Sequence, residues 1–340
     1  MRTEESTGLG ALARMLGDAK ARFARRRLCA GEIPNPDDFV RHGLRMSAAE
    51  SQAFAEWVKS GLHTRVETEH PAADGTVRLV IALLGGERIE TVAMPTGTTC
   101  VSSQVGCAVG CRFCASGLLG VKKNLSVDEI TEQVLFARRR LAVKRVVYMG
   151  MGEPTHNLEN VLAAVARLRD WFGISPNRQV LSTVGSLAAF EVMTQAALRP
   201  CLALSLHTID DRRRAELLVR APRDGVRDLI AAADAYGRAM GMPIQIEWTL
   251  LKGVNDSLEE AAQLADHLAG VRACLNYIVY NPVDGLDYER VDDQTVARIA
   301  ALMRSKRVYT TVRRSRGDDA EAACGQLRRR AVAAVESEEP

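Results

Sequence analysis

The sequence contains no long apolar run, and this absence excludes a membrane-spanning protein. A helix that crosses a bilayer needs about 20 consecutive apolar residues, and no segment of the 340-residue chain approaches that length. The N-terminal residues MRTEESTGLG are polar and lack the apolar core of a secretion signal. We therefore expect a cytoplasmic protein with no membrane contact.

Aromatic residues are few, and neither charge is in large excess. Phe, Trp and Tyr make up 5% of the chain, which leaves little material for an extended base-stacking surface. The 45 Lys and Arg residues nearly balance the 42 Asp and Glu residues, for a net charge of +3, so the overall charge does not indicate a nucleic-acid-binding protein. Basic residues do gather at 20–27 and 304–316, and each stretch predicts either a solvated face or a contact to RNA phosphates.

Strand-like and helix-like segments alternate over most of the chain. Residues 76–95, TVRLVIALLGGERIETVAMP, have the pattern of a β-hairpin. Further strands are predicted at 98–103, 145–150, 178–183, 201–206, 244–251, 274–280 and 308–313, and helices at 126–140, 157–171, 186–196, 211–218, 225–240, 257–269 and 293–306. Repeated strand–helix units indicate a parallel sheet wrapped by helices. We expect an α/β fold that is a partial or complete βα barrel, with a doubly wound open sheet as the alternative.

The chain is predicted to divide into three parts. Residues 1–70 form a mostly helical accessory unit and a candidate RNA contact, residues 71–330 form the βα catalytic domain, and residues 331–340 form an acidic tail. Several helices in the catalytic domain are expected to begin at capping residues, namely Ser126, Asn157, Ser257 and Asp293.

Three of the eight cysteines lie close together, in the pattern Cys107-x-x-x-Cys111-x-x-Cys114. A disulfide framework suits short secreted chains, so this spacing instead indicates thiolates that hold a metal or an iron–sulfur cluster. Zinc sites usually add a second cysteine pair or histidines, and zinc remains the alternative here. Three thiolates on a four-iron cluster would leave one iron open to a small chelating ligand. Cys201 and Cys274 lie in apolar runs and are predicted to be buried.

Polar residues recur just after the predicted strands. They are Gly152 and Glu153 after the second strand, Ser182 after the third, Ser205 and His207 after the fourth, and Asn281 after the sixth, while the first strand leads into the cysteine segment. In a βα barrel these positions line the rim at the carboxyl ends of the strands, where such folds place their active sites. A single Ser or Asn after a strand is more often a turn residue, but recurrence once per βα unit favours a shared site.

These motifs resemble those of a known family. The three-cysteine motif, with Phe113 before its last cysteine, and the Gly152-Glu153 step are similar to motifs of the radical S-adenosylmethionine (SAM) superfamily. Four longer segments resemble the RlmN/Cfr class of radical SAM RNA adenosine methyltransferases: CVSSQVGC at 100–107, MGMGEP at 149–154, SLH at 205–207 and RGDDAEAACGQL at 316–327. The resemblance implies a radical SAM partial (β/α) barrel with a small N-terminal helical domain and a β-hairpin extension.

The resemblance also implies a role for each matching residue. Cys107, Cys111 and Cys114 would ligate a [4Fe-4S] cluster. The residues that match SAM-contacting positions are Gly152, Glu153, Ser182, Ser205, Leu206, His207 and Asn281. Cys324 matches the cysteine that carries a methyl group, Cys100 matches its resolving partner, and Glu90 matches the proton acceptor.

The implied reaction is unusual because a ring carbon of adenine is not nucleophilic. It consumes two SAM molecules per turnover: the first methylates the Cys324 thiolate, and the second yields a 5′-deoxyadenosyl radical that removes hydrogen from this methyl group. The carbon radical adds to the adenine ring, which then loses an electron and the ring proton to the candidate base Glu90. Cys100 attacks the Cys324 sulfur, leaving a disulfide and a methylated base.

The implied partners are 23S rRNA, with tRNA as a second candidate, and a flavodoxin- or ferredoxin-like electron donor; we expect a monomer. Methylation at carbon 2 is favoured. The alternatives within the class are carbon-8 methylation of 23S rRNA, as in Cfr-type antibiotic resistance, and a paralogue acting on another RNA, because residues 1–65 depart from the family pattern. The alternative from a different class is a non-catalytic RNA-binding protein stabilised by zinc.

Overall fold

The computed structural model describes residues 7–313, 317 and 321–327. Two features of the sequence analysis lie outside these residues: Arg314 and Arg316 of the second basic stretch, and the acidic tail at 331–340. Within the described part of the chain, no helix combines the length and the apolar character that a membrane span requires.

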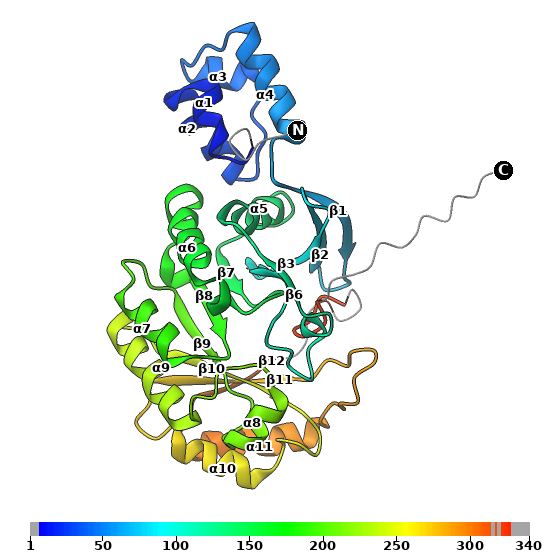
Figure 1. The fold of residues 1–340 in the computed structure, drawn as a ribbon, viewed down its shortest axis with the longest axis vertical. Helices are drawn as coiled ribbons and strands as arrows, with labels where there is room; N and C mark the ends of the chain where they lie inside the picture. Colours follow the sequence, from blue (N-terminus) through cyan, green and yellow to red (C-terminus); the bar gives the residue numbers. More distant parts are fainter. Residues whose placement is uncertain (1–6, 314–316, 318–320, 328–340) are drawn as a thin grey trace, which may run out of the picture.

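A ten-stranded sheet forms the centre of the molecule (Figure 1). In spatial order its strands are β1 (Thr64–Pro71), β2 (Val77–Leu83), β3 (Arg88–Ala93), β4 (Thr98–Cys100), β7 (Arg145–Tyr148), β8 (Gln179–Thr183), β9 (Cys201–Ser205), β10 (Ile244–Leu250), β11 (Ala273–Val279) and β12 (Thr310–Arg313). The ladders from β1 to β4 are antiparallel, and those from β4 to β12 are parallel. A second, small sheet pairs β5 (Gln104–Gly106) with β6 (Val121–Asn124).

The parallel strands follow one another in sequence order, with helices between neighbours. These helices are α5 (Val127–Arg138), α6 (Leu158–Phe172), α7 (Leu187–Gln195), α8 (Asp211–Leu217), α9 (Val226–Met240), α10 (Leu258–His267) and α11 (Asp293–Ser305). In a doubly wound sheet the strand order reverses at a switch point, and here it does not. Among the described strands no ladder joins β12 back to β4. The predicted partial βα barrel with a hairpin extension is therefore confirmed, and the doubly wound alternative is wrong.

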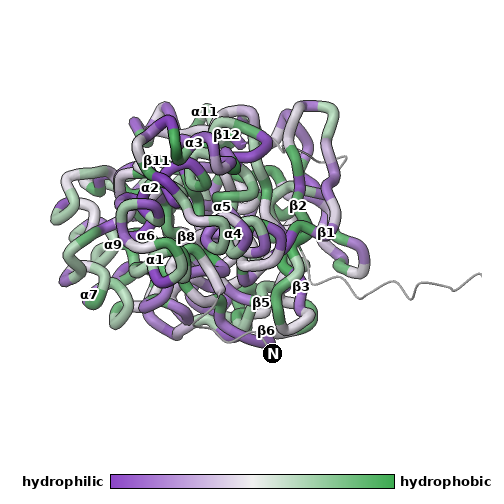
Figure 2. Tube along the Cα trace, turned by 90° about the horizontal axis from the view of Figure 1, so that it is seen from above, coloured by the Kyte–Doolittle hydropathy of each residue, from purple (hydrophilic) through white to green (hydrophobic). Residues whose placement is uncertain are grey.

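Hydrophobic periodicity explains why these segments take their places. In α9 the buried residues Val226, Leu229, Ile230 and Ala233 recur at helical spacing, so one face packs on the sheet. The hairpin strands β2 and β3 are hydrophobic along most of their length and almost wholly buried (Figure 2). The core thus runs continuously beneath the helices and into the hairpin extension.

Two of the four predicted helix caps are confirmed. The side chains of Ser126 and Ser257 accept hydrogen bonds from backbone N–H groups in the first turns of α5 and α10. Asp292, rather than Asp293, caps α11. Asn157 precedes α6 without capping it, because its side-chain amide donates to two backbone carbonyls near β5 and β6.

The sequence analysis missed β1 and the β5–β6 pair. β1 is an edge strand with an irregular burial pattern, so it lacks the alternation that identifies a half-buried strand. β5 and β6 are only three and four residues long. Cys201 is buried as predicted, whereas the prediction for Cys274 is wrong, because this residue at the start of β11 is only partly buried.

Four helices precede the sheet: α1 (Ala11–Leu16), α2 (Asp18–Cys29), α3 (Pro36–Arg41) and α4 (Ala48–Ser60). Their core includes Phe39 and Phe54, whose ring centroids lie 5.5 Å apart in an edge-to-face arrangement. In Figure 1 this helical unit lies above α5 and α6, and α2 contacts both helices. The basic stretch of α2 takes part in this packing, because the Arg25 guanidinium lies 4.8 Å from the ring centroid of Trp171 on α6.

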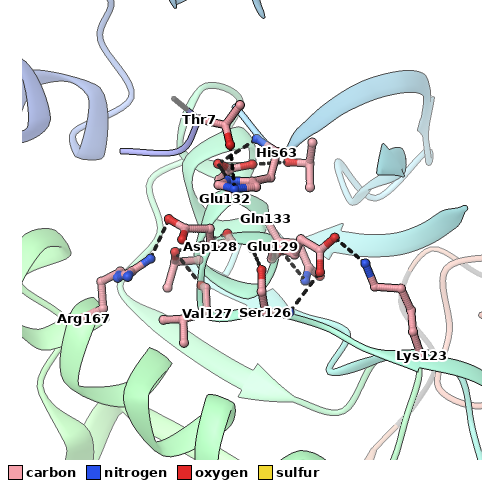
Figure 3. Close-up of polar contacts among 12 residues, drawn as sticks. Thr7, His63, Lys123, Ser126, Val127, Asp128, Glu129, Glu132, Gln133 and Arg167 are labelled. Carbon is pink, nitrogen blue, oxygen red and sulfur yellow. Dashed lines mark hydrogen bonds and ion pairs between the residues drawn. The ribbon is translucent and has the colours of Figure 1, made fainter. Parts of the chain in front are cut away.

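A buried carboxylate ties the end of the helical unit to α5 (Figure 3). Glu132 accepts hydrogen bonds from the backbone N–H of His63, at 3.1 Å, and from the Thr64 hydroxyl, at 2.6 Å. The His63 ring continues the network, with Nδ1 3.5 Å from Glu132 Oε1 and Nε2 2.9 Å from the Thr7 hydroxyl. Residues from the N-terminus, the start of β1 and α5 therefore meet at one point.

His63 is the basic residue that faces the buried Glu132 carboxyl group. The two neighbouring carboxylates of α5 pair with Arg167 and Lys123. Glu132 forms no salt bridge with a Lys or Arg within the described ranges, and burial raises its pKa. The hydrogen bond and the negative charge of Glu132 raise the pKa of His63 above its ordinary value.

This pair predicts a pH-dependent stability. Because the folded state raises the pKa of His63, its contribution to the free energy of unfolding is complete below the unfolded pKa of about 6.5 and is lost as the pH rises through the folded pKa. We expect the free energy of urea unfolding to fall in the wild type as the pH rises above about 6.5, and to fall less in Glu132→Gln. An equal fall in both proteins would contradict this assignment.

Candidate active site

One loop between β5 and β6 carries Cys107, Cys111 and Cys114. Two backbone hydrogen bonds of 2.9 Å, made through the N–H groups of Arg112 and Arg220, tie this loop to residues 217–220 after α8. Gly110 turns the chain with a φ of 65°, in the left-handed region that favours glycine. As a result, all three cysteines line one cavity, which we call the cluster cavity.

Apolar side chains surround the three thiols. Val109, Phe113 and Leu218 pack around them. Burial raises the pKa of the Cys107 thiol to about 12, and burial together with the neighbouring thiols raises the pKa of Cys111 well above its ordinary value. Free thiols would therefore stay protonated here, whereas a bound metal deprotonates the thiols that coordinate it. The pocket fits cysteines that act as metal ligands.

The spacing of the sulfurs favours an iron–sulfur cluster over zinc. Zinc–sulfur bonds of about 2.3 Å in tetrahedral geometry place the sulfurs about 3.8 Å apart. In the described part of the chain, the group that brings three ligand atoms within 4.8 Å of one another is His63, Asp128 and Glu132, and the three cysteines do not meet this limit. As their side chains stand, the three cysteines are not arranged around a single zinc ion, and their number matches a cluster in which each of three irons takes one thiolate.

The Gly-Glu step after β7 forms a second wall of the cluster cavity. The Glu153 carboxylate accepts hydrogen bonds from the backbone N–H groups of Thr155 and Val184, both at 3.0 Å, so its position is fixed. Gly152 has a φ of 107°, and a Cβ there would lie 2.7 Å from Ser103 Oγ. Only glycine can therefore bring this turn so close to the segment that leads into the cysteine loop.

Polar residues at the ends of β8 and β9 complete the rim. The hydroxyls of Ser182 and Ser205 lie 3.1 Å apart and line the cluster cavity with His207. His207 has a φ of 66°, and its Nδ1 accepts a hydrogen bond from the backbone N–H of Thr249 at 3.0 Å. Burial and the nearby charge of Arg214 lower the pKa of His207 to about 3. The ring is therefore neutral, with its hydrogen on Nε2.

Two of the predicted SAM contacts lie away from this cavity. The Leu206 side chain is buried in the core, and it is not part of the cavity wall. Asn281 lines a neighbouring cavity, which also contains Cys100 and which we call the inner cavity. The Asn281 amide donates to the backbone carbonyl of Cys324 at 3.1 Å, so the structure connects it to the cysteine predicted to carry the methyl group.

Cys324 stands between the two cavities. The walls of both the cluster cavity and the inner cavity contain Met149, Ile278 and Cys324. Cys324 is exposed, and burial together with the nearby Cys324 raises the pKa of Cys100. Cys324 can therefore be reached from the cluster cavity, which holds the cysteine triad, and from the inner cavity, which contains Cys100.

Residues 321–327 dock directly on the cysteine loop. The backbone N–H of Ala115 donates to the carbonyl of Gly325 at 2.8 Å, and the Ser116 hydroxyl donates to the carbonyl of Leu327 at 2.5 Å. Ala115 follows the last cysteine of the triad. Because Ala115 follows Cys114 and Gly325 follows Cys324, the hydrogen bond between them holds the two cysteines at fixed positions relative to each other.

The structure places Glu90 outside both cavities. Glu90 is buried on β3, and its carboxylate pairs with Arg78 of the neighbouring strand β2. The hairpin thus supplies a buried partner for this carboxylate. Glu90 lines neither cavity, so its role as proton acceptor stays a prediction.

The second basic stretch splits into two groups. Arg304, Lys306 and Arg307 are exposed around the end of α11. Arg313 instead lines the inner cavity, where its guanidinium donates to Gln245 Oε1 at 3.0 Å. The first group remains a candidate RNA contact, whereas Arg313 belongs to the barrel interior.

The sequence analysis missed the polar residues that β10 contributes to the site. Gln245, Glu247 and Thr249 alternate along this strand; Gln245 lines the inner cavity, and the other two line the cluster cavity. They lie within the strand rather than beyond its end, so they do not follow the pattern of polar residues after strands. The period-2 pattern in IQIEWTL was the signal that could have placed them on one face.

Known proteins with similar sequences show which family the chain belongs to. Residues 101–265 match the Radical SAM superfamily. The chain is 48% identical to a probable RNA methyltransferase of Methylibium petroleiphilum, over 86% of this chain and 81% of that protein. It is 44% identical to a probable RNA methyltransferase of Pseudomonas aeruginosa, over 86% and 82%.

Solved structures extend the comparison. The crystal structure of a radical SAM methyltransferase from Sphaerobacter thermophilus matches with a TM-score of 0.84 and 31% identity, over 96% of this chain and 99% of that chain. Streptococcus suis SuiB bound to S-adenosylmethionine matches with a TM-score of 0.51 and 15% identity, over 96% and 72%, which shows a shared fold.

The cysteine loop predicts a cluster that depends on all three thiols. After anaerobic reconstitution with iron and sulfide, we expect the wild type to gain a brown iron–sulfur absorption, and Cys107→Ala, Cys111→Ala and Cys114→Ala to lose most of it. Cys274→Ala, a partly buried cysteine outside the site, should match the wild type. Full iron content in any triad variant, or zinc in place of iron in the wild type, would contradict the assignment.

Proposed function

The chain belongs to the family of radical SAM RNA methyltransferases that its relatives represent, and on this premise we propose that it methylates a ring carbon of adenosine in RNA, with carbon 2 favoured. The proposed substrate is 23S rRNA, with tRNA as a second candidate, and the electron donor is a flavodoxin- or ferredoxin-like protein. The observation that carries this proposal is the position of Cys324, which borders both the cluster cavity and the cavity of Cys100.

The cluster cavity supplies the binding groups for the cofactors. Cys107, Cys111 and Cys114 would hold a [4Fe-4S] cluster, which in this superfamily supplies the electron that cleaves SAM. Glu153 and the hydroxyls of the serines after β8 and β9 line the space next to the cysteines. Apolar side chains pack around the triad on the protein side.

Cys324 carries the methyl group in the proposed reaction. Its thiol gives its proton to solvent, and the thiolate then attacks the methyl carbon of one SAM. A bond from the Cys324 sulfur to this carbon forms, the bond from the carbon to the SAM sulfur breaks, and S-adenosylhomocysteine leaves. After a hydrogen atom is removed from this S-methyl group, the carbon bonds to the adenine ring. The ring then loses one electron, which the cluster held by the cysteine triad would accept, and the ring proton, which is assigned to Glu90 by family resemblance alone. These two losses restore the aromatic ring.

Cys100 completes the turnover. Its thiolate attacks the Cys324 sulfur, an S–S bond forms, the S–C bond to the base breaks, and the methylated base leaves. Cys100 and Cys324 line the same inner cavity, which supports this pairing. A second SAM is consumed in the radical step, so the proposed stoichiometry is two SAM per methylated base.

Loss of the methyl carrier should abolish the reaction. Because no other thiol lines both cavities among the described residues, we expect reconstituted Cys324→Ala to transfer no methyl group from labelled SAM to RNA, while keeping its cluster absorption. Cys274→Ala should transfer methyl groups at the wild-type rate. Normal RNA methylation by Cys324→Ala would overturn the proposed function.

Loss of the resolving thiol should stop the reaction one step later. In Cys100→Ala the base would stay bonded to the Cys324 methylene, so we expect a covalent protein–RNA species on a denaturing gel. The doubly substituted Cys100→Ala, Cys324→Ala protein should show none. A folded Cys100→Ala protein that releases methylated RNA at the wild-type rate would remove Cys100 from the resolving role.

A further inference from the structure

A second group of metal-ligating side chains lies outside the cluster cavity and the inner cavity. His63, Asp128 and Glu132 each offer one ligand atom, and these atoms lie within 4.8 Å of one another. The two carboxylates are one helical turn apart on α5, so they project from the same side of the helix. His63 lies between α4 and β1. Figure 3 shows the three side chains together, where the N-terminal helical unit meets α5.

The His63 ring presents a nitrogen that suits a metal ion. Its Nε2 lies 2.9 Å from the Thr7 hydroxyl, and a ring that donates from Nε2 keeps a lone pair on Nδ1. Nδ1 is buried, and in the described part of the chain no group meets it with ordinary hydrogen-bond geometry. It lies 3.5 Å from Glu132 Oε1. Two ligands of a tetrahedral zinc ion, with bonds of about 2.0–2.1 Å, lie about 3.4 Å apart.

A glycine leaves space beside two of the three ligands. Gly8 has a φ of 75°, in the left-handed region. A Cβ at this position would lie 2.9 Å from both His63 Nδ1 and Asp128 Oδ1. A side chain on residue 8 would therefore press against both ligand atoms, and glycine keeps the space next to them clear.

Each ligand is also oriented by an outer partner. The Thr7 hydroxyl meets the histidine ring, Arg167 donates to Asp128 Oδ1 at 2.6 Å, and the Thr64 hydroxyl donates to the second carboxylate of α5 at 2.6 Å. Metal-binding histidines and carboxylates are usually held by such outer hydrogen bonds, which fix the ring tautomer and the direction of the lone pairs. The three groups are therefore arranged before an ion arrives.

We propose that His63 Nδ1, Asp128 and Glu132 bind one Zn²⁺ ion, which joins the end of the N-terminal helical unit to α5. One imidazole and two carboxylates suit a transition-metal ion, whereas Mg²⁺ and Ca²⁺ favour oxygen ligands alone. His63 also lines a surface groove between α4 and the strands β1 and β2, which gives an ion a route to the site. This inference goes beyond the proposed function, because neither SAM nor RNA takes part in it.

The ion would stabilise the junction of two parts of the chain. Its ligands come from the segment before β1 and from α5, so they are brought together only in the folded state, and an ion that binds this state stabilises it. A metal ion and a proton compete for His63 Nδ1, so binding releases any proton on Nδ1 to solvent. The fall in stability above about pH 6.5 therefore belongs to the metal-free protein.

The experiment measures zinc binding while the cysteine triad is kept out of the competition. Thiolates bind zinc, so we would use the cluster-loaded wild type and, in parallel, the triple variant Cys107→Ala, Cys111→Ala, Cys114→Ala, both treated with a chelator. In equilibrium dialysis against zinc chloride, we expect one tightly bound zinc ion per chain in both proteins. Excess Mg²⁺ should not displace it, and zinc should raise the midpoint of thermal unfolding.

Substitutions that keep side-chain volume locate the site. Added to the triple variant, Glu132→Gln and Asp128→Asn each remove one charged ligand. We expect each to weaken zinc binding at least as much as the loss of an outer partner does, by about 10- to 100-fold, and to remove the thermal shift. Glu129→Gln is the matched control, because Glu129 lies on the same helix but pairs with Lys123. This variant should bind zinc like its parent.

The outcomes separate this inference from the proposed function. Zinc binding by the triple variant needs neither cluster nor SAM, so it is independent of RNA methylation. No tightly bound zinc in either parent protein would overturn the inference. Unchanged zinc affinity in Glu132→Gln and Asp128→Asn, an equal loss in Glu129→Gln, or equally tight binding of Mg²⁺ would also overturn it.

Discussion

The rest of the site depends on one short connection, the docking of residues 321–327 on the cysteine loop. A hydrogen bond from Ala115 to Gly325 and another from Asn281 to Cys324 hold this segment from two sides of the barrel. Because Cys324 borders both cavities, a shift of either support would move its sulfur relative to the cysteine triad and to Cys100 together. Methyl transfer to Cys324 and the later attack of Cys100 on its sulfur therefore both depend on the position of this one segment.

The barrel interior is adapted to a polar ligand. Barrels of this class usually fill their interior with branched apolar side chains, whereas here Gln245, Glu247, Asn276 and Arg313 are joined by hydrogen bonds and an ion pair. Such a network is costly unless its members satisfy one another. Each of these residues makes at least one such contact, and one oxygen of Glu247 is left without a hydrogen-bond partner among the residues that the structure describes.

Much of this architecture could be predicted from the sequence, because strand and helix periods and residues that follow strands are local signals. They correctly brought the cysteine triad, Glu153 and the serines after β8 and β9 to one cavity. Other features depend on contacts between distant segments. Glu90 is buried because β2 supplies Arg78, Asn281 finds its partner in the backbone of Cys324, and Glu247 lies within a strand, where polar residues give no rim signal.

Nucleoside mass spectrometry of RNA tests the central claim most directly. The protein would be expressed in a bacterial host that lacks its own enzyme of this family, and 2-methyladenosine and 8-methyladenosine would be quantified separately in rRNA and tRNA. The account predicts that 2-methyladenosine appears in rRNA. Only 8-methyladenosine would contradict the assigned carbon, and the absence of both nucleosides from RNA in cells that contain the cluster-loaded protein would contradict the assigned function.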